Sequence, residues 1–366
     1  MRKLIELCLL AVEKNASDIL LINDKPPQIK VHGVFQPVRN EPVIDKNKMT
    51  EFTKELVKST ELPEGFIKTV KKKGVVEIAL TLETKPILTR LRISIYLEKG
   101  NLAISIRLLP QRIFSFEEIF LLQDYIPKIK NLLMRWNGLI LVTGPTGTGK
   151  TTTLATFLDY ILKNRSVHFI TLEDPIEFVF DNRAYLGTVS QREYGRDFFD
   201  FASAIVSGMR QAPNGFVVAE IRDLQTAETA LRAAETGHLV IATLHTRNAA
   251  ETVTRYVDIF PEIIRPLIRT QFSMATIGIL CQRLIPHASG SGRVACFELV
   301  FVKPAYANLI REWKIQQLDA YVRGEIGIRY DEYLVELIKR GIVTPNDGFS
   351  YANDPSELKR LLDKEK

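Results

Sequence analysis

The residues best suited to chemistry lie in one stretch, 144–151, which reads GPTGTGKT. This order matches G-x-x-x-x-G-K-[ST], the pattern of a phosphate-binding loop (P-loop). An apolar run at 139–142 precedes it and indicates a buried strand, and apolar residues recur at helical spacing over 152–164 after it. A strand, the loop and a helix in this order are the context that the motif requires. The alternative is a turn rich in glycine and threonine that binds nothing.

Each residue type in this loop has a role in holding a phosphate chain. Glycines let the backbone curl so that N–H groups point at the β-phosphate, and the positive end of the next helix adds to that field. Lys150 is expected to reach the β- and γ-phosphates, and the Thr151 hydroxyl to bind Mg²⁺. The expected nucleotide-binding residues of this stretch are Gly144, Thr146, Gly147, Thr148, Gly149, Lys150, Thr151 and Thr152.

Acidic residues follow two further apolar runs, and functional groups of open α/β sheets gather at such strand ends. Glu173 and Glu177 come directly after the run 167–172, where carboxylates can orient Mg²⁺ or water. The alternative for this pair is capping and turn formation around Pro175. Glu220 follows the run 216–218. We expect the metal ligands to be Thr151, Glu173 and Glu220.

An apolar strand that ends in an acid is the Walker B pattern, whose acid holds Mg²⁺ or polarises the attacking water. Ala219 occupies the position where aspartate is usual, so Glu220 must carry the role. We expect Glu220 to act as the general base or to position the water. The alternative is a surface glutamate paired with Arg222.

Two histidines bracket the apolar run 239–243. His245 follows it, where a side chain can sense the γ-phosphate, and is expected in the catalytic set with Glu173, Glu177 and Glu220. His238 precedes it and is expected to contact the nucleotide, although a lone histidine is more often structural. The spacing of histidines and cysteines matches no metal cage.

Arg90, Arg92 and Arg107 lie on expected strands near the N-terminus. Phosphoryl transfer benefits from an arginine finger, and a finger from a neighbouring subunit makes hydrolysis depend on assembly. The alternative is a set of ordinary exposed strand arginines, which the residues alone favour.

The pattern of elements predicts two domains, as expected for 366 residues. Residues 1–109 alternate helix and strand as an α+β domain, with a hairpin around His32–Gly33. Residues 110–115 are the expected linker. Residues 116–366 are the expected second domain. From Leu139 onward, apolar strands alternate with helices, which indicates a doubly wound α/β sheet. Beyond about residue 250 the pattern is mostly helical, with one strand near 294–299.

Composition narrows the functional classes. The 46% hydrophobic and 25% charged content is that of a globular protein, and no apolar run approaches the length of a membrane span. Three distant cysteines argue against disulfides and zinc, and fit a reducing cytosolic setting. Residues 1–110 hold 19 Lys and Arg against 13 Asp and Glu, so the whole net charge of +6 lies there. This surplus suits nucleic acid, an anionic membrane or phosphate ligands, or is a solvated basic face such as Lys71–Lys73.

Six segments together resemble the secretion ATPases of type II secretion and type IV pili. They read GPTGTGKTTT (144–153), TLEDPIEF (171–178), QREYGRD (191–197), RQAP (210–213), VVAEIRD (217–223) and TGHLVIATLHT (236–246). Four of them, 144–153, 171–178, 217–223 and 236–246, correspond to the Walker A, Asp box, Walker B and His box of that family, and all six match it in order and spacing. Residues 16–18, 26–27 and 31–38 also resemble the PAS-like N-terminal domain of the family.

Within the family, the retraction ATPases of type IV pili are the most similar. The chain is short, lacks the four-cysteine zinc module usual in assembly ATPases, and reads AYANLIRE at 305–312. The retraction signature is AIRNLIRE, so Tyr306 and Ala307 depart from it, and the loss of that arginine removes any role that depends on its charge.

The resemblance implies a PAS-like domain at 1–109, a linker at 110–115 and a RecA-like ATPase domain with a helical C-terminal region at 116–366. It implies a homohexameric ring that uses ATP and Mg²⁺. Arg90 and Arg107 match interface arginines that reach the phosphates of a neighbour, and Arg92 lies beside them. It also implies a cytoplasmic motor at the inner membrane, working against the platform protein of the pilus.

Three alternatives remain open at this point. An assembly ATPase of the same family is disfavoured by the missing cysteines and the short N-terminus. A RecA-like nucleic-acid translocase is suggested by the pI of about 9.0, but no basic stripe interleaved with aromatic residues supports direct nucleic-acid binding. A nucleotide-gated scaffold without catalysis is difficult to reconcile with Glu220.

Overall fold

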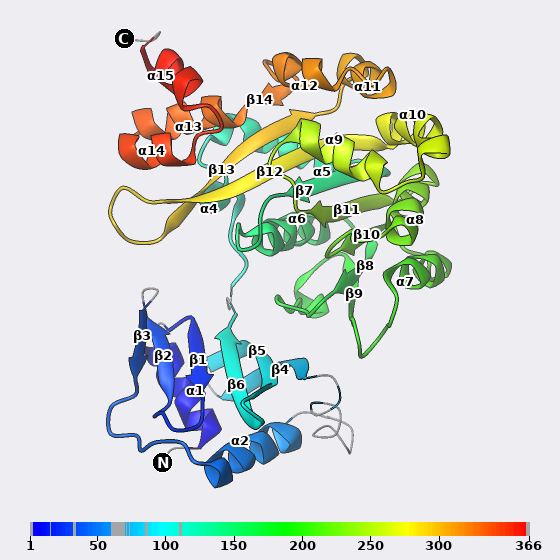
Figure 1. Ribbon diagram of the computed structural model, residues 1–366. Coiled ribbons are helices and arrows are strands. Elements are labelled where there is room, and N and C mark those ends of the chain that lie inside the picture. Colours follow the sequence, from blue (N-terminus) through cyan, green and yellow to red (C-terminus); the bar gives the residue numbers. More distant parts are fainter. Residues whose placement is uncertain are drawn as a thin grey trace. The chain divides into compact units, whose positions relative to one another are not determined.

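Figure 1 shows a computed structural model of the chain, which describes residues 3–14, 16–31, 34–59, 70, 72, 74–84, 87–109 and 112–363. The chain divides into two compact units, each with its own hydrophobic core. The first contains residues up to Arg112 together with Pro175–Val179, and the second contains Ile113–Asp174 and Phe180 onward. The expected turn at His32–Gly33, most of the basic run Lys71–Lys73 and the first two linker residues lie outside the described residues.

The first unit is built on a six-stranded antiparallel sheet in the order β3-β2-β1-β6-β5-β4. Helices α1 and α2 accompany it, and strand residues such as Ile93, Ile104 and Ile106 enter its core. This is the α+β arrangement expected from the sequence. Its elements are α1 Leu4–Glu13, β1 Asp18–Leu21, β2 Gln28–Val31, β3 Val34–Pro37, α2 Lys46–Ser59, β4 Val75–Thr84, β5 Ile87–Glu98 and β6 Asn101–Leu108.

The second unit is a doubly wound α/β domain, and the expected fold class is therefore confirmed. Its sheet has the order β14-β13-β12-β7-β11-β10-β8-β9, parallel from β12 to β9 and antiparallel beyond β12. Helices cover both faces (Figure 1). The strands are β7 Gly138–Thr143, β8 His168–Glu173, β9 Thr188–Glu193, β10 Gly215–Val218, β11 Leu239–Leu244, β12 Thr276–Pro286, β13 Arg293–Phe301 and β14 Gly327–Ile328.

The helices of this unit fall into two groups. Helices α7 to α12 pack with the sheet in one large core. A chain of stacked rings, from Phe116 through Phe120 to Phe157 and Phe297, joins α4, α6 and β13 on the other side. The α-helices are α4 Phe116–Ile119, α5 Ile126–Leu133, α6 Lys150–Asn164, α7 Phe201–Gly208, α8 Leu224–Glu235, α9 Ala249–Asp258, α10 Arg265–Ala275, α11 Pro304–Arg311, α12 Ile315–Tyr321, α13 Tyr330–Lys339, α14 Pro345–Tyr351 and α15 Pro355–Asp363.

Two sequence-based expectations about these elements are wrong. The C-terminal part contains the eleven-residue strand β12 beside β7, where mostly helical structure was expected. Its apolar run is interrupted by Gln282 and Arg283, which hides the strand pattern. The helix expected over 197–210 begins later, as α7, because Asp200 caps it by accepting from the backbone N–H of Ser203.

Short 3₁₀ turns complete the unit: η1 Gln123–Tyr125, η2 Asn182–Ala184, η3 Met209–Gln211 and η4 Glu262–Ile264. Among the described residues, no helix has the length and apolarity to cross a lipid bilayer.

Candidate functional site

The glycine-rich loop lies at the carboxyl end of β7, between strands β11 and β12. Gly144, Gly147 and Gly149 all have positive φ, the backbone region that side chains disfavour. At Gly144 a Cβ atom would lie 2.2 Å from the carbonyl oxygen of Gln282, so only glycine fits there. Helix α6 begins at Lys150, and its first free N–H groups therefore face the loop.

Lys150 is folded back onto its own loop. Its Nζ donates to the carbonyl oxygens of Gly144 at 2.7 Å and Pro145 at 3.1 Å, and lies 3.4 Å from His245 Nδ1. Burial lowers the pKa of Lys150, and the charge of Glu220 partly opposes this shift. The ammonium group thus occupies the mouth of the loop, where a phosphate could replace the two carbonyl partners.

Glu220 lies just beyond the carboxyl end of β10 and is held by two side chains. Arg222 Nε donates to one carboxylate oxygen at 2.8 Å, and His245 Nε2 lies 3.1 Å from the other. Burial works to raise the pKa of Glu220, but the hydrogen bonds and charges of Arg222 and His245 outweigh it and hold the pKa below its usual value. The carboxylate is therefore ionised near neutral pH, as a group that activates water must be.

His245 connects the lysine and the glutamate. A single tautomer serves both contacts: Nε2–H donates to Glu220 while Nδ1 accepts from Lys150. The pairing of Glu220 with Arg222, considered above as an alternative to catalysis, is present together with the contact between Glu220 and His245. The structure thus brings Lys150, Glu220 and His245 into one hydrogen-bonded cluster.

Glu173 lies at the carboxyl end of β8 and is oriented by neutral donors. The Thr171 hydroxyl donates to its Oε1 at 2.7 Å, and Gln191 Nε2 at 3.1 Å. Among the described residues, no group of three or more His, Cys, Asp or Glu side chains could hold a metal by itself. The site suits Mg²⁺, which commonly takes one or two protein oxygens and completes its shell with phosphate and water.

One expected site residue of the second unit, His238, lies away from the P-loop. His238 precedes β11 and so lies at the amino ends of the strands, whereas the P-loop lies at their carboxyl ends. Its Nδ1 is 3.1 Å from the Ala233 carbonyl oxygen, and its ring packs against Phe216. The six residues of β11 separate these two ends, so the structure does not bring His238 to the loop. Glu177 belongs to the segment Pro175–Val179 of the first unit.

The three arginines share one face of the first unit's sheet. Arg90 and Arg92 are two residues apart on β5, and Arg92 lies opposite Arg107 on β6. Arg90 Nε donates to the Ile176 carbonyl oxygen at 3.0 Å. Arg92 pairs with Glu77 and Arg107 with Asp18, each at 3.0 Å.

Gln282 is a site residue that sequence reasoning missed. It is buried on β12, donates from Nε2 to the Thr148 carbonyl oxygen at 2.7 Å and accepts the Thr153 hydroxyl at 2.7 Å. It therefore fixes the loop to the start of α6. The available signal was a glutamine inside an apolar run, since a buried amide must find hydrogen-bond partners.

Comparison with known proteins agrees with this geometry. A family model described as type II/IV secretion system protein matches residues 71–336, which is more than half of the chain. The chain belongs to this family. The type IV pilus retraction ATPase PilT of Pseudomonas aeruginosa is 34% identical to this chain. The match covers 96% of this chain and 99% of PilT.

Two further matches concern motors of type IV pili, one for retraction and one for assembly. A crystal structure of the pilus retraction motor PilT with bound ADP superposes with a TM-score of 0.87 at 38% identity, over 98% of this chain and 100% of that one. The type IV pilus assembly ATPase PilB of Pseudomonas aeruginosa is 46% identical, but over only 33% of this chain and 20% of its own.

Proposed function

We propose that this protein is an ATPase motor that powers the retraction of type IV pili and thereby twitching motility. The observation that carries the proposal is the end-to-end match to a retraction ATPase, which covers 99% of that relative. The match to the assembly ATPase PilB covers 20% of PilB, so the similarity there is confined to a part of that protein. Retraction is therefore favoured over assembly.

The cluster at the P-loop can act on ATP as substrate. The turn of the loop and the start of α6 supply N–H groups for the phosphates, and Lys150 exchanges its two backbone acceptors for phosphate oxygens. The ionised Glu220 orients or deprotonates the attacking water, and His245 keeps that carboxylate beside the lysine. Glu173 completes the polar wall of the site. ATP hydrolysis thus depends on residues from four strand ends.

A magnesium ion fits this site. Thr151 offers a hydroxyl at the start of α6, and Glu173 and Glu220 offer carboxylate oxygens. When bound, the ion neutralises phosphate charge. Hydrogen bonds from Thr171 and Gln191 fix the orientation of the Glu173 carboxylate.

We also assign the remaining features to an assembled motor. Residues 1–109 form a PAS-like domain, 110–115 a linker and 116–366 the RecA-like ATPase domain of a homohexamer. The sheet face that carries Arg90, Arg92 and Arg107 supplies positive charge to the ATP of a neighbouring subunit. Glu177, which also belongs to the first unit, is assigned to the same site. The assembly works in the cytoplasm against the inner-membrane platform protein of the pilus.

The test combines enzymology and a pilus count. Purified Lys150→Ala should lose ATP binding or turnover, and Glu220→Ala should keep ATP binding but lose hydrolysis. Cells lacking the gene should carry excess surface pili and lose twitching, and only wild type, not Glu220→Ala, should restore both. Full ATPase activity in Glu220→Ala would refute the catalytic assignment, and bald cells would show an assembly motor.

A further inference from the structure

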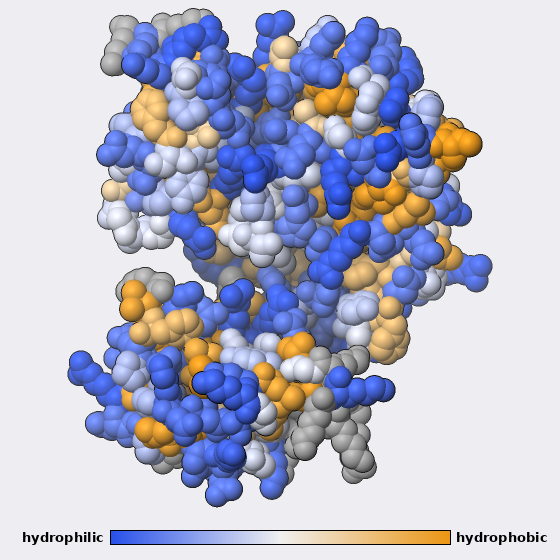
Figure 2. Space-filling model, in the orientation of Figure 1, coloured by the Kyte–Doolittle hydropathy of each residue, from blue (hydrophilic) through white to orange (hydrophobic). Residues whose placement is uncertain are grey.

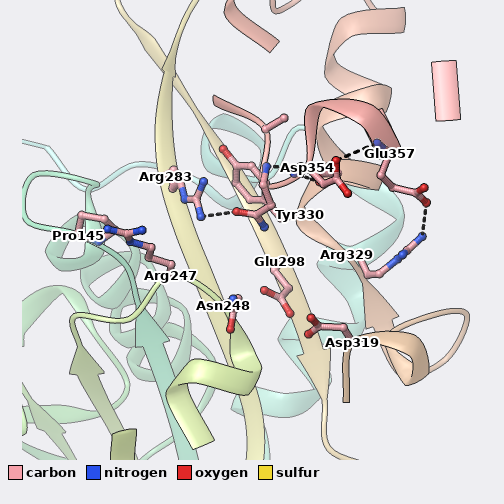
Figure 3. A pocket seen from close by; sticks show the side chains of 13 residues that line it. Pro145, Arg247, Asn248, Arg283, Glu298, Asp319, Arg329, Tyr330, Asp354 and Glu357 are labelled. Atoms are coloured by element: carbon pink, nitrogen blue, oxygen red, sulfur yellow. Dashed lines mark hydrogen bonds and ion pairs between the residues drawn. The ribbon is translucent and has the colours of Figure 1, made fainter. Parts of the chain in front are cut away.

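A large polar pocket opens beside the P-loop in the second unit (Figure 3). It has a volume of about 880 Å³ and reaches from Pro145 across β12 and β13 to the C-terminal helices. Glu298 of β13 lines it although its side chain is almost fully buried, with 3% exposed. In Figure 3 this carboxyl group lies between Asn248 and Asp319. A buried carboxyl group outside the ATP site requires an explanation.

The carboxyl group of Glu298 contacts the first turn of α9. Its Oε2 accepts a hydrogen bond from the backbone N–H of Ala249 at 3.2 Å. That N–H is one of the first four of the helix, which have no partner within it. Asn248 caps the same turn by accepting from the N–H of Glu251 at 2.7 Å. Glu298 therefore satisfies a buried donor that the helix cap leaves open.

The first turn of α9 is linked directly to the loop that carries His245. The hydroxyl groups of Thr246 and Thr252 are 2.7 Å apart, and Thr252 also lies 3.4 Å from Thr143 at the end of β7. All three threonines are buried. Since His245 immediately precedes Thr246, the position of α9 determines where the imidazole meets Glu220.

We propose that Glu298 is a positioning residue for hydrolysis: its carboxyl group fixes the first turn of α9 and, through it, the place of His245 beside Glu220 and Lys150. The proposal rests on the proposed ATPase function. It gives a role to a residue 53 positions away from His245 in the chain, on strand β13, which pairs with β12 and β14.

The charges around Glu298 indicate which form of the carboxyl group does this. Burial raises its pKa to about 8, and Asp319 of α12 acts in the same direction, as does Asp331 of α13. The Ala249 N–H and Arg283 of β12 act against them.

Two further groups face Glu298. Cys281 lies opposite it on β12 and is buried, and the buried Tyr306 hydroxyl of α11 has no hydrogen-bond partner among the described residues. These surroundings favour the neutral carboxyl group, whose carbonyl acceptor a glutamine amide can reproduce. Ionisation would place a second negative charge beside Asp319 and strengthen the hydrogen bond from the Ala249 N–H, so the geometry of the turn depends on the charge of Glu298.

The experiment measures kcat and KM for ATP, with the affinity for a non-hydrolysable ATP analogue, in the full-length protein. We expect Glu298→Ala to lower kcat between about 10- and 100-fold, as a misplaced catalytic group does, with analogue affinity unchanged. Glu298→Gln should keep the wild-type kcat at pH 7. Cys296→Ala is the matched control, because it opens a cavity on the same strand, against the Tyr330 carbonyl oxygen and away from α9; its kcat should be unchanged.

A pH profile separates positioning from simple destabilisation. The wild-type kcat should change between pH 7 and 9 as Glu298 ionises, and that of Glu298→Gln should not. An identical profile in both proteins, or an unchanged kcat in Glu298→Ala, would overturn the proposal. If Glu298→Ala does not fold, the Glu298→Gln profile alone decides. A wild-type protein without ATPase activity would instead overturn the proposed function, so the two failures can be told apart.

Discussion

Lys150, His245 and Glu220 form one cluster in which each side chain already has polar partners. The lysine is bonded to carbonyl oxygens of its own loop, and the glutamate to Arg222 and His245. Each contact is one that a phosphate or a water molecule can replace. Because the partly buried lysine and glutamate already face charged or polar partners, the site has little reorganisation to do when ATP enters.

The raised pKa of Glu298 makes a prediction about stability. In the folded chain this pKa is about 8, whereas an unfolded glutamate ionises near pH 4.5. The folded state therefore keeps a proton that the unfolded state has lost between these values. The stabilisation is complete below pH 4.5, falls as the pH rises by about 1.4 kcal/mol per pH unit, and is lost above pH 8.

Glu298→Gln cannot titrate and should lack this slope. Urea unfolding at pH 5, 6.5 and 8 measures it, and both tryptophans, Trp136 and Trp313, report on the second unit. The difference between the two proteins should shift steadily in favour of the glutamine variant as the pH rises. A constant difference across this range would show that Glu298 is ionised in the folded state.

Strand β12 shows what the sequence could and could not reveal at the level of elements. The P-loop strand and the acidic strand ends were predictable because each motif is local, and α/β topology then places their carboxyl ends at one edge. Gln282 and Glu298 were not, because their roles depend on which strands pair: β12 lies beside β7, and Cys281 lies opposite Glu298. The same geometry places His238, which precedes β11, at the amino ends of the strands and away from the P-loop.

Gln282 should control the shape of the P-loop. Gln282→Leu keeps the volume but leaves the Thr148 carbonyl oxygen and the Thr153 hydroxyl without their partner, and each lost bond contributes about 1 kcal/mol. We expect about tenfold weaker ATP binding in equilibrium titrations. Thr229→Val is the control, since it removes hydroxyl hydrogen bonds to the Gln225 and Thr226 carbonyl oxygens around α8, none of them in the loop or α6. Equal affinities in the two variants would show that the loop holds its shape without Gln282.

The arginine face of the first unit should matter only for hydrolysis. The Arg107 side chain is 62% exposed, and exposed ion pairs such as that with Asp18 contribute about 0–1 kcal/mol, so a phosphate can displace the partner. As an arginine finger, Arg107→Gln should lower kcat by about 10³-fold or more while ATP binding persists. Arg232→Gln is the control, because the Arg232 side chain is 55% exposed and is paired with Glu228 on α8. A loss below tenfold would mark Arg107 as an ordinary surface arginine.

At the scale of the whole molecule, the proposed oligomer needs a surface through which its subunits meet. Large apolar side chains are exposed along η4 and α10: Ile263, Ile264, Leu267 and Met274. Figure 2 shows orange atoms at its right edge, where α10 lies in Figure 1. Contiguous exposed apolar residues mark interaction sites more often than bare surface. Because the proposed motor is a homo-oligomer, we assign this patch to contact with a second copy of the chain.

Leu267→Glu tests this assignment, because a charge in an apolar contact is costly unless it is paired. We expect light scattering with an ATP analogue present to show smaller particles than the wild type forms. The ATPase rate should fall in parallel, since each site would lose the arginines of its neighbour, while the analogue affinity of the isolated P-loop persists. Leu186→Glu, at another exposed leucine of the second unit, should assemble normally. If Leu267→Glu assembles and hydrolyses ATP like the wild type, α10 faces a different partner, and the arginine-bearing sheet face becomes the surface to test for subunit contact.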